Sequence, residues 1–239
     1  MTDLKTLPLF ELLEKRRRHV REYKTNVIPD KKLIDEALWK AWKTTPSKQN
    51  MQAYRCDVYG PDKQEEKKKI WKLVNKNHRD SDIRANADGI ANVTQNALEE
   101  PNPHYAHVLS CSHLFLIQSR LCTPNKYFQY QIDQGSHFAD EQHEIYVNRI
   151  VDHTALETGM FASNLSAGLL ANDIDVSYTI CFVRDAQQWR DLGLDMMHRP
   201  LFIMTCGYAK RYRWQDHQDN NVPVEDDLRP DHDTIIKWI

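Results

Sequence analysis

The segment from Ile145 to Ala171 constrains the fold of this chain more than any other. Small and apolar side chains occupy every side of a helix drawn through it, and they include Gly159, Ala162 and Gly168. A helix that is apolar on all sides is normally buried among close neighbours. We therefore expect a central helix over these residues, ended by Asn172 in the left-handed conformation of a helix cap.

Shorter elements are predicted on both sides of this helix. Apolar residues at helical spacing follow Asp30, a suitable N-cap, and Thr45 ends that helix because it precedes a proline. A charged amphipathic helix is expected over 63–74 and a short helix over 185–192. Strands are expected over 54–59, within the apolar run 107–119, over 177–183 and over 201–206. Strands and helices therefore alternate along the chain.

Length and composition favour a single domain. The chain has 239 residues, of which 41% are hydrophobic, which is enough to bury one sizeable core. We take residues 1–239 as one domain with two polar excursions, near 75–105 and 123–143. The second excursion is expected to be irregular, with aromatic residues that could cover a pocket.

Charge and hydropathy argue against two kinds of partner. A formal net charge of -2 does not suit a nucleic-acid surface, which usually has a basic excess. No stretch reaches the apolar length that spans a bilayer, and Met1–Lys5 lacks the apolar core of a signal peptide. We expect a soluble, cytoplasmic protein with no nucleic-acid or membrane partner.

The reactive residue types form no recognisable catalytic or metal motif. The five cysteines have no C-x-x-C spacing, and most lie in apolar runs where a thiol behaves as a small hydrophobe. Among the eleven histidines, His104 and His107 are close in sequence but lack the spacing of a zinc-protease helix. We therefore assign no metal ligand and no catalytic residue.

A basic cluster near the start of the chain is the first candidate for binding a cofactor. With seven glycines and neither a dinucleotide-binding nor a P-loop motif, a bound phosphate must be held mainly by side chains. We expect a helix from about Pro8 to run into the cluster, so that Arg17, Arg18 and Arg21 could converge on one anion through forked hydrogen bonds. The alternative is an exposed basic helix end that complements its own dipole.

The loop after the second predicted helix is the other candidate. It contains Pro46, Ser47, Asn50 and Gln52, whose hydroxyl and amide groups could reach the ribityl chain and ring edge of a flavin. The basic cluster and this loop together indicate a phosphate-bearing flavin cofactor.

These two segments resemble motifs of the FMN-dependent nitroreductase family. Arg17–Tyr23, RRHVREY, is similar to the family's R-R-S-x-R-x-F opening, and Pro46–Tyr54, PSKQNMQAY, is similar to its P-S-x-x-N-x-Q-P-W loop. The small-residue helix, the Gly207-Tyr208 pair and Arg229-Pro230 before the apolar end also match the form of the family. The resemblance covers nearly the whole chain.

The resemblance implies an α+β, nitroreductase-like fold with a central, mainly antiparallel sheet flanked by helices. It also implies an obligate homodimer with two FMN molecules at its interface. The arginines of the first segment and Arg229 would bind the phosphate and ribityl chain, while the loop from Pro46 approaches the flavin from the other subunit. The complete set of expected cofactor-binding residues is Arg17, Arg18, His19, Arg21, Pro46, Ser47, Lys48, Asn50, Gln52 and Arg229.

The activity implied by the resemblance is hydride transfer from NADH or NADPH to FMN, and then to a nitroaromatic, quinone or similar acceptor. The cofactor carries this chemistry and the protein orients it. The chain departs from the family pattern at His19, which replaces a hydroxyl residue, and at Tyr178–Phe182, which replaces P-x-E-G-F. Alternatives are dimethylbenzimidazole synthase-like chemistry, reductive dehalogenation, and FMN binding without catalysis.

The chain ends on large apolar residues that need a partner surface. Apolar surface left in water costs about 25 cal/mol per Å². The large apolar residues of this end are Ile235, Ile236, Trp238 and Ile239. We expect this tail to dock on the second subunit of a homodimer; the alternative is the sheet edge of its own subunit.

Overall fold

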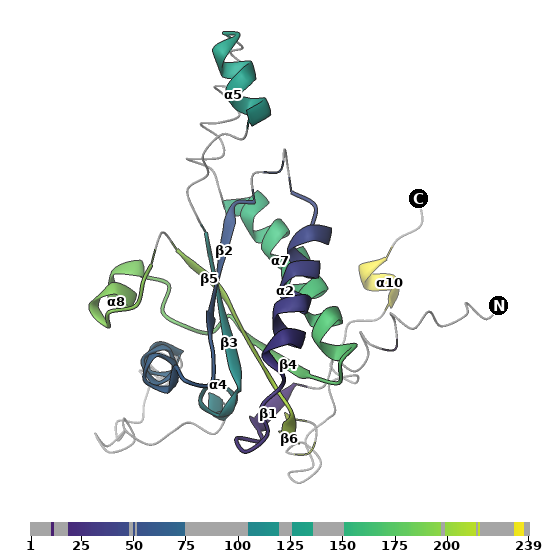
Figure 1. Cartoon of the computed structure of the whole chain (residues 1–239), viewed down its shortest axis with the longest axis vertical. Helices are drawn as coiled ribbons and strands as arrows, with labels where there is room; N and C mark the ends of the chain where they lie inside the picture. The colour runs from purple at the N-terminus through teal and green to yellow at the C-terminus, as the bar shows by residue number, and fades with distance from the viewer. Residues whose placement is uncertain are drawn as a thin grey trace, which may run out of the picture.

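A four-stranded antiparallel sheet forms the centre of the computed structural model, which describes residues 11, 19–47, 50, 52–74, 105–119, 126–135, 151–196, 199–213, 215 and 232–236. The strand order is β2 (Tyr54–Tyr59), β3 (His113–Ser119), β5 (Pro200–Gly207) and β4 (Asp175–Thr179) (Figure 1). A separate two-stranded antiparallel sheet pairs β1 (Val20–Tyr23) with β6 (Ala209–Tyr212). The expected α+β fold with a mainly antiparallel sheet is confirmed.

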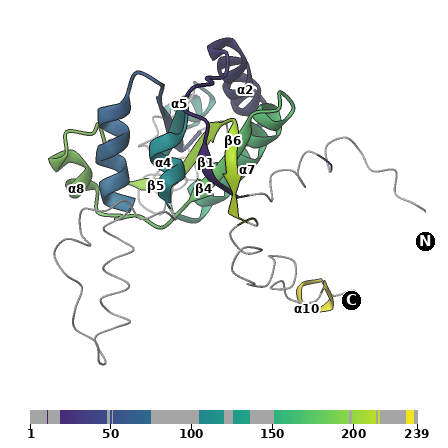
Figure 2. The ribbon, with the colours of Figure 1, turned by 90° about the horizontal axis from the view of Figure 1, so that it is seen from below.

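Helices cover both faces of the larger sheet. One face carries α2 (Lys31–Thr44) and α7 (Val151–Leu170), and the other carries a helix over 64–74, α4 (Ala106–Ser110) and α8 (Ala186–Asp191) (Figure 2). Along β3, Phe115 and Ile117 pack into the α2 and α7 layer, whereas Leu114 and Leu116 pack into the other layer. The sheet therefore separates two buried apolar layers. The remaining helices, α5 (Lys126–Asp133) and α10 (His232–Ile235), lie away from the sheet.

Local sequence signals set the ends of α2 and its distance from α7. The Asp30 side chain caps α2 by accepting a hydrogen bond from the Lys32 amide at 2.9 Å, and Thr45 leaves the helix in an extended conformation. Where the helices cross, a Cβ atom built on Gly168 would lie 3.2 Å from the Cβ atom of Ala37. The small residues of α7 thus allow a close approach of the two helices.

The central helix differs from the sequence prediction at its surface and at its end. It is not buried all round: Leu156 is 63% exposed, and Gly159 and Ser163 are exposed on the same helix, because α2 and the sheet cover only its other sides. The left-handed residue at its end is Asp173, with a φ of 56°, and not Asn172. The amides of Asp173 and Ile174 bond back to Leu170 and Leu169, which makes Asp173 the position that needs a positive φ.

Three further expectations were wrong in detail. Arg21 lies in β1 and not at a helix end, because Val20 and Tyr23 are buried where that strand pairs with β6. The apolar run from His107 begins as α4, and its strand starts only at His113. The second excursion contains α5 and is not irregular throughout. Most of the helix expected from Pro8, and the excursion over 75–104, lie outside the described residues.

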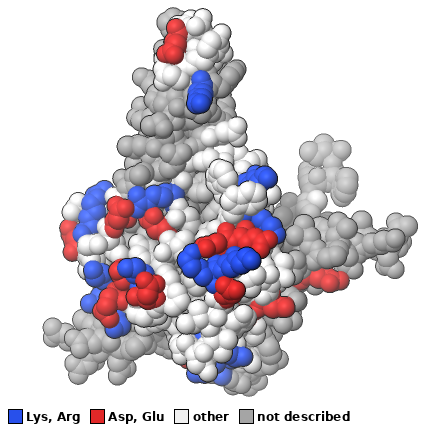
Figure 3. Space-filling view, in the orientation of Figure 1, with Lys and Arg blue, Asp and Glu red and all other residues white. Residues whose placement is uncertain are grey.

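Acidic and basic side chains alternate over the described part of the face shown in Figure 3. Many of them form short-range pairs along helices, such as Lys31 with Asp35 at 2.5 Å and Lys40 with Glu36 at 2.6 Å. Within the described ranges, no helix is both long enough and apolar enough to span a bilayer.

Candidate functional site

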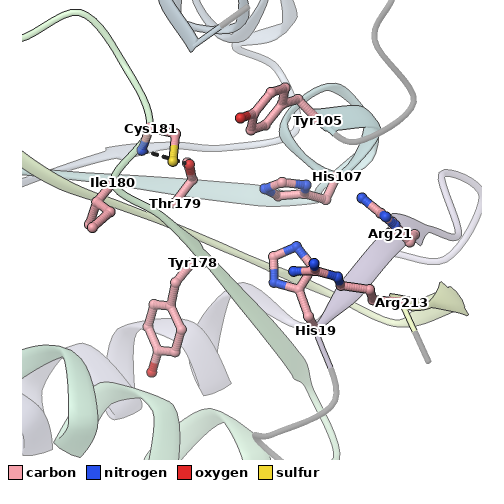
Figure 4. Close-up of a pocket in the computed structure, with 9 residues that line it drawn as sticks. All are labelled: His19, Arg21, Tyr105, His107, Tyr178, Thr179, Ile180, Cys181 and Arg213. Atoms are coloured by element: carbon pink, nitrogen blue, oxygen red, sulfur yellow. Dashed lines mark hydrogen bonds between the residues drawn. The ribbon is translucent and has the colours of Figure 1, made fainter. Parts of the chain in front are cut away.

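A pocket of about 410 Å³ opens between the small sheet, α4 and the end of β4. Four elements or their ends contribute to it, so it exists only in the folded chain. Its lining residues are His19, Arg21, Tyr105, His107, Tyr178, Thr179, Ile180, Cys181 and Arg213 (Figure 4). Its volume lies within the range of small-molecule and cofactor sites, roughly 300–1,000 Å³.

Two histidines lie side by side in the pocket. The ring of His19 meets the ring of His107 edge-on, with centroids 5.2 Å apart (Figure 4). His19 Nδ1 also lies 3.0 Å from the buried Ser177 Oγ. Burial, reinforced by the charges of Arg213 and Arg21, lowers the pKa of His19 to about 4. His19 is therefore neutral at physiological pH and offers one donor and one acceptor.

Two arginines give the pocket its positive charge. Arg21 lies in β1, and Arg213 directly follows β6, which pairs with it. The amide of Arg213 donates a 2.7 Å hydrogen bond to the carbonyl oxygen of His19, which fixes the chain beside the first imidazole. Both side chains extend toward the histidines (Figure 4). Paired guanidinium groups suit the forked recognition of phosphate or carboxylate.

The opposite wall combines aromatic, apolar and hydroxyl groups. It is formed by Thr179, Ile180 and Cys181 at the end of β4, with Tyr105 before α4. The ring of Tyr178 turns away from the histidines, toward Phe202 and Ser166 (Figure 4). The Cys181 amide donates a 3.2 Å hydrogen bond to Thr179 Oγ1, which shapes the turn where the strand ends. This wall can lie against a planar ring, while the arginines bind an anionic group. The residues present therefore fit a flavin that carries a phosphate.

The second predicted segment lies elsewhere in the subunit. Ser47 donates a hydrogen bond to Glu157 of α7 and accepts one from the Gln52 amide, and Pro46 and Asn50 are exposed. None of these residues lines the pocket that contains His19 and Arg21. One chain therefore brings together His19 and Arg21 but keeps the loop apart from them. Arg17, Arg18, Lys48 and Arg229 lie outside the described residues.

Several pocket residues were missed by the sequence interpretation. Arg213 and Tyr105 stand outside every motif, and His107 was considered only as a metal ligand. The structure brings them together because α4 packs against β1 and because β6 pairs with β1. Two departures from the family pattern could have indicated this pocket in the sequence: His19 in the basic cluster, and the segment Tyr178–Phe182 at the end of β4.

A second and larger cavity, of about 560 Å³, lies between the start of α2 and the end of β2. It is lined mainly by apolar residues such as Ile28, Leu38 and Val58, and its Lys31 is already paired with Asp35. It contains none of the predicted cofactor-binding residues. The smaller, cationic pocket is therefore the candidate functional site.

The fold and this pocket together define an α+β protein with a cationic pocket where its two sheets meet. The sequence matches the model of the nitroreductase family over residues 15–208, so the chain belongs to this family. The resemblance seen in the sequence is confirmed. No curated protein matches the chain by sequence.

Solved structures share the fold at low sequence identity. A protein of Bacillus subtilis assigned as a nitroreductase has a TM-score of 0.63 and 16% identity, covering 97% of this chain and 99% of that chain. A similarly assigned protein of Exiguobacterium sibiricum, in complex with FMN, has a TM-score of 0.62 and 18% identity, with 97% of each chain covered. A protein of Staphylococcus epidermidis assigned as an NAD(P)H:FMN oxidoreductase has a TM-score of 0.61 and 16% identity, with 100% of each chain covered. At these identities the likeness shows the nitroreductase-like fold alone.

Proposed function

We propose that this protein is an FMN-dependent oxidoreductase that uses NADH or NADPH to reduce a nitroaromatic, a quinone or a similar acceptor by a ping-pong mechanism. The observation that carries the proposal is the pocket in which Arg21 and Arg213 flank two buried or half-buried imidazoles opposite Tyr105 and the end of β4. Family membership and the FMN bound in the Exiguobacterium neighbour support it.

Each side of the pocket has a distinct part in this proposal. Arg21 and Arg213, with Arg17, Arg18 and Arg229 from the sequence pattern, would bind the phosphate and ribityl chain. His19, neutral and oriented by Ser177, would contribute an uncharged hydrogen bond. When bound, FMN would accept a hydride from the nicotinamide and pass it to the acceptor. The protein binds and orients the reactants, so no catalytic dyad is required.

The proposed assembly is a homodimer with each cofactor between two subunits. The loop with Ser47 and Asn50 lies apart from the pocket within one chain, and α7 has an exposed side at Leu156 and Gly159. A second subunit could cover that side of α7 and supply its loop to the pocket. We place no nucleic acid or membrane among the partners.

The first experiment is the identification of the chromophore. The purified protein should be yellow, and chromatography of the chromophore released by heat should identify FMN. Addition of NADPH and a quinone should then give steady-state oxidation of the nicotinamide. A colourless protein that also fails to bind added FMN would contradict the proposal.

Two matched variants test whether this pocket is the binding site. Arg213→Ala should weaken FMN binding, because a charge-assisted hydrogen bond contributes roughly 1.5–3 kcal/mol, or about tenfold or more in affinity. The control, Arg211→Ala, removes the same side chain from β6, where it is exposed and outside the pocket. Fluorescence titration of the apo-protein measures both affinities. Equal affinities for the two variants would place the phosphate elsewhere.

The alternative function is specialised flavin chemistry on the same fold. The altered segment Tyr178–Cys181 lines the pocket, and iodotyrosine deiodinase, bound to FMN and 3-iodo-L-tyrosine, is among the fold neighbours with a TM-score of 0.55 and 15% identity. A protein that binds FMN but oxidises no NADPH in the presence of a quinone would favour this chemistry, or binding without catalysis.

A further inference from the structure

Glu157 is a buried acidic residue of α7 outside the pocket. Only 3% of the surface of Glu157 is exposed to solvent. Its Oε2 atom accepts a hydrogen bond from Ser47 Oγ at 3.0 Å and one from the Ala53 amide at 3.4 Å. A carboxylate is costly to bury unless hydrogen bonds compensate it. Here the compensating donors come from the loop that joins α2 to β2.

Ser47 extends this connection along the loop. Its Oγ atom donates to Glu157 and accepts a 2.8 Å hydrogen bond from the Gln52 amide. Because a carboxylate is an acceptor, the Ser47 hydroxyl proton points to Glu157 and its lone pairs face Gln52. Glu157 thereby orders both ends of the segment from Ser47 to Ala53.

The loop needs such support because two of its residues adopt an unusual backbone. Asn50 has a φ of 56° and Gln52 a φ of 50°, both in the left-handed region. Asn enters this region more readily than most residues, whereas Gln has no such preference. The conformation at Gln52 is therefore stabilised by its surroundings, and its amide is the group that Ser47 binds.

A second contact fixes the start of the loop to the same helix. Asn164, two turns further along α7, donates a 3.2 Å hydrogen bond to Thr45 Oγ1, which itself donates to the Ala41 carbonyl oxygen at 2.6 Å. The helix therefore fixes the loop at Thr45 and again at Ser47 and Ala53. Between these points, Asn50 is exposed at the surface of the subunit.

We propose that Glu157 is a positioning residue, which holds Ser47 and Ala53, on either side of Asn50, in the arrangement that presents Asn50 and Ser47 to the cofactor of a partner subunit. This inference rests on the proposed FMN-dependent function. In this inference Glu157 contributes to FMN binding without touching the cofactor. The left-handed backbone at Asn50 and Gln52 then has a role in presenting Asn50 to the cofactor.

The first measurement does not depend on FMN. Hydrogen exchange of the full-length apo-protein should show faster exchange at the Gln52 and Ala53 amides in Glu157→Ala, by about tenfold or more, because their hydrogen-bond acceptors are lost or displaced. Amides in β3 should exchange as in the wild type. Glu157→Gln keeps an acceptor oxygen and should restore much of the protection.

The second measurement links the loop to the cofactor. Glu157→Ala should weaken FMN binding by about tenfold or more, and Ser47→Ala should do the same, but the double variant should be little weaker than either alone, since both changes break one network. Glu157→Gln should bind FMN nearly as the wild type does. The control is Glu36→Ala, which removes a carboxylate from the exposed, Lys40-paired surface of α2.

The two measurements separate the possible failures. Unchanged amide exchange in Glu157→Ala would overturn the positioning role even if the wild type binds FMN. Faster exchange with unchanged FMN affinity would show that the loop has no part in binding, and would also overturn it. A wild type that binds no FMN would overturn the proposed function and this inference with it, although exchange would still show whether Glu157 orders the loop.

Discussion

The imidazole of His19 is held by groups from three other parts of the chain. Ser177 in β4 lies at hydrogen-bond distance, His107 in α4 meets its ring edge, and Arg213 after β6 binds its carbonyl oxygen. At the scale of single residues, the pocket is thus built around a neutral side chain. Because His19 is neutral, the positive charge beside it comes from Arg21 and Arg213.

Protonation of His19 should make stability depend on pH. The unfolded chain takes up a proton near the ordinary pKa of 6.5, whereas the folded protein does so only near pH 4. Between these values the unfolded state binds more protons, so the free energy of unfolding should fall as the pH is lowered. The slope contributed by His19 should reach at most about 1.4 kcal/mol per pH unit. Urea unfolding of the apo-protein at a series of pH values measures it.

The matched variant for this prediction is His19→Gln, which keeps a neutral group able to hydrogen-bond Ser177. It should reduce the pH dependence between about pH 6 and pH 4.5. Burial also lowers the pKa of His113, so part of the dependence should remain. A variant with the same pH dependence as the wild type would mean that His19 titrates normally in the folded protein.

At the scale of elements, those with local signals were predicted well. The Asp30 cap and the proline after Thr45 gave both ends of α2, and the strand over 54–59, closed by the turn residues Gly60 and Pro61, is β2 with its observed bounds. Arg21 was assigned to a helix because β1 is specified by its pairing with β6, where Val20 lies opposite Tyr212. The pocket combines residues of β1, α4, β4 and the end of β6, and no local pattern marks such a combination.

The contact between α2 and α7 should tolerate little extra volume. Gly168→Val should lower the free energy of unfolding by about 1–3 kcal/mol, since added carbon atoms must displace Ala37 on the facing helix. The control, Ala167→Val, adds a β-branched residue to α7 at the neighbouring, partly exposed position. Chemical denaturation compares the two variants. Valine has a higher helix propensity than glycine, so any loss in Gly168→Val comes from packing, and a variant as stable as the wild type would contradict the prediction.

At the scale of the whole molecule, the pocket and the loop from Thr45 are separate. The pocket is lined by residues of β1, α4, β4 and the end of β6, whereas the loop follows α2 and is bonded to α7 through Ser47. The separation supports the proposed homodimer, in which each site is shared between two copies. It also explains why the two sequence motifs, though both assigned to one cofactor, do not meet in one chain.

The apolar C-terminal segment should contribute to this assembly. Ile235 is 69% exposed and Ile236 is 50% exposed, so they are available to a partner subunit. Deletion of Thr234 to Ile239 should therefore reduce both dimer formation and FMN content. Light scattering and flavin absorbance measure these, and circular dichroism confirms that the truncated chain is folded. A truncated protein that stays dimeric with full FMN would show that the tail is dispensable.

The pairing of β1 with β6 also sets the order in which the pocket can be completed during translation. Arg21 leaves the ribosome early, but the partner strand that ends at Tyr212 emerges nearly two hundred residues later. All four strands of the larger sheet precede β6 in the sequence, so their pairing can begin before the pocket exists. Contacts of such long sequence separation form late in folding. A nascent chain can therefore acquire most of its core before Arg21 and Arg213 come together in the pocket.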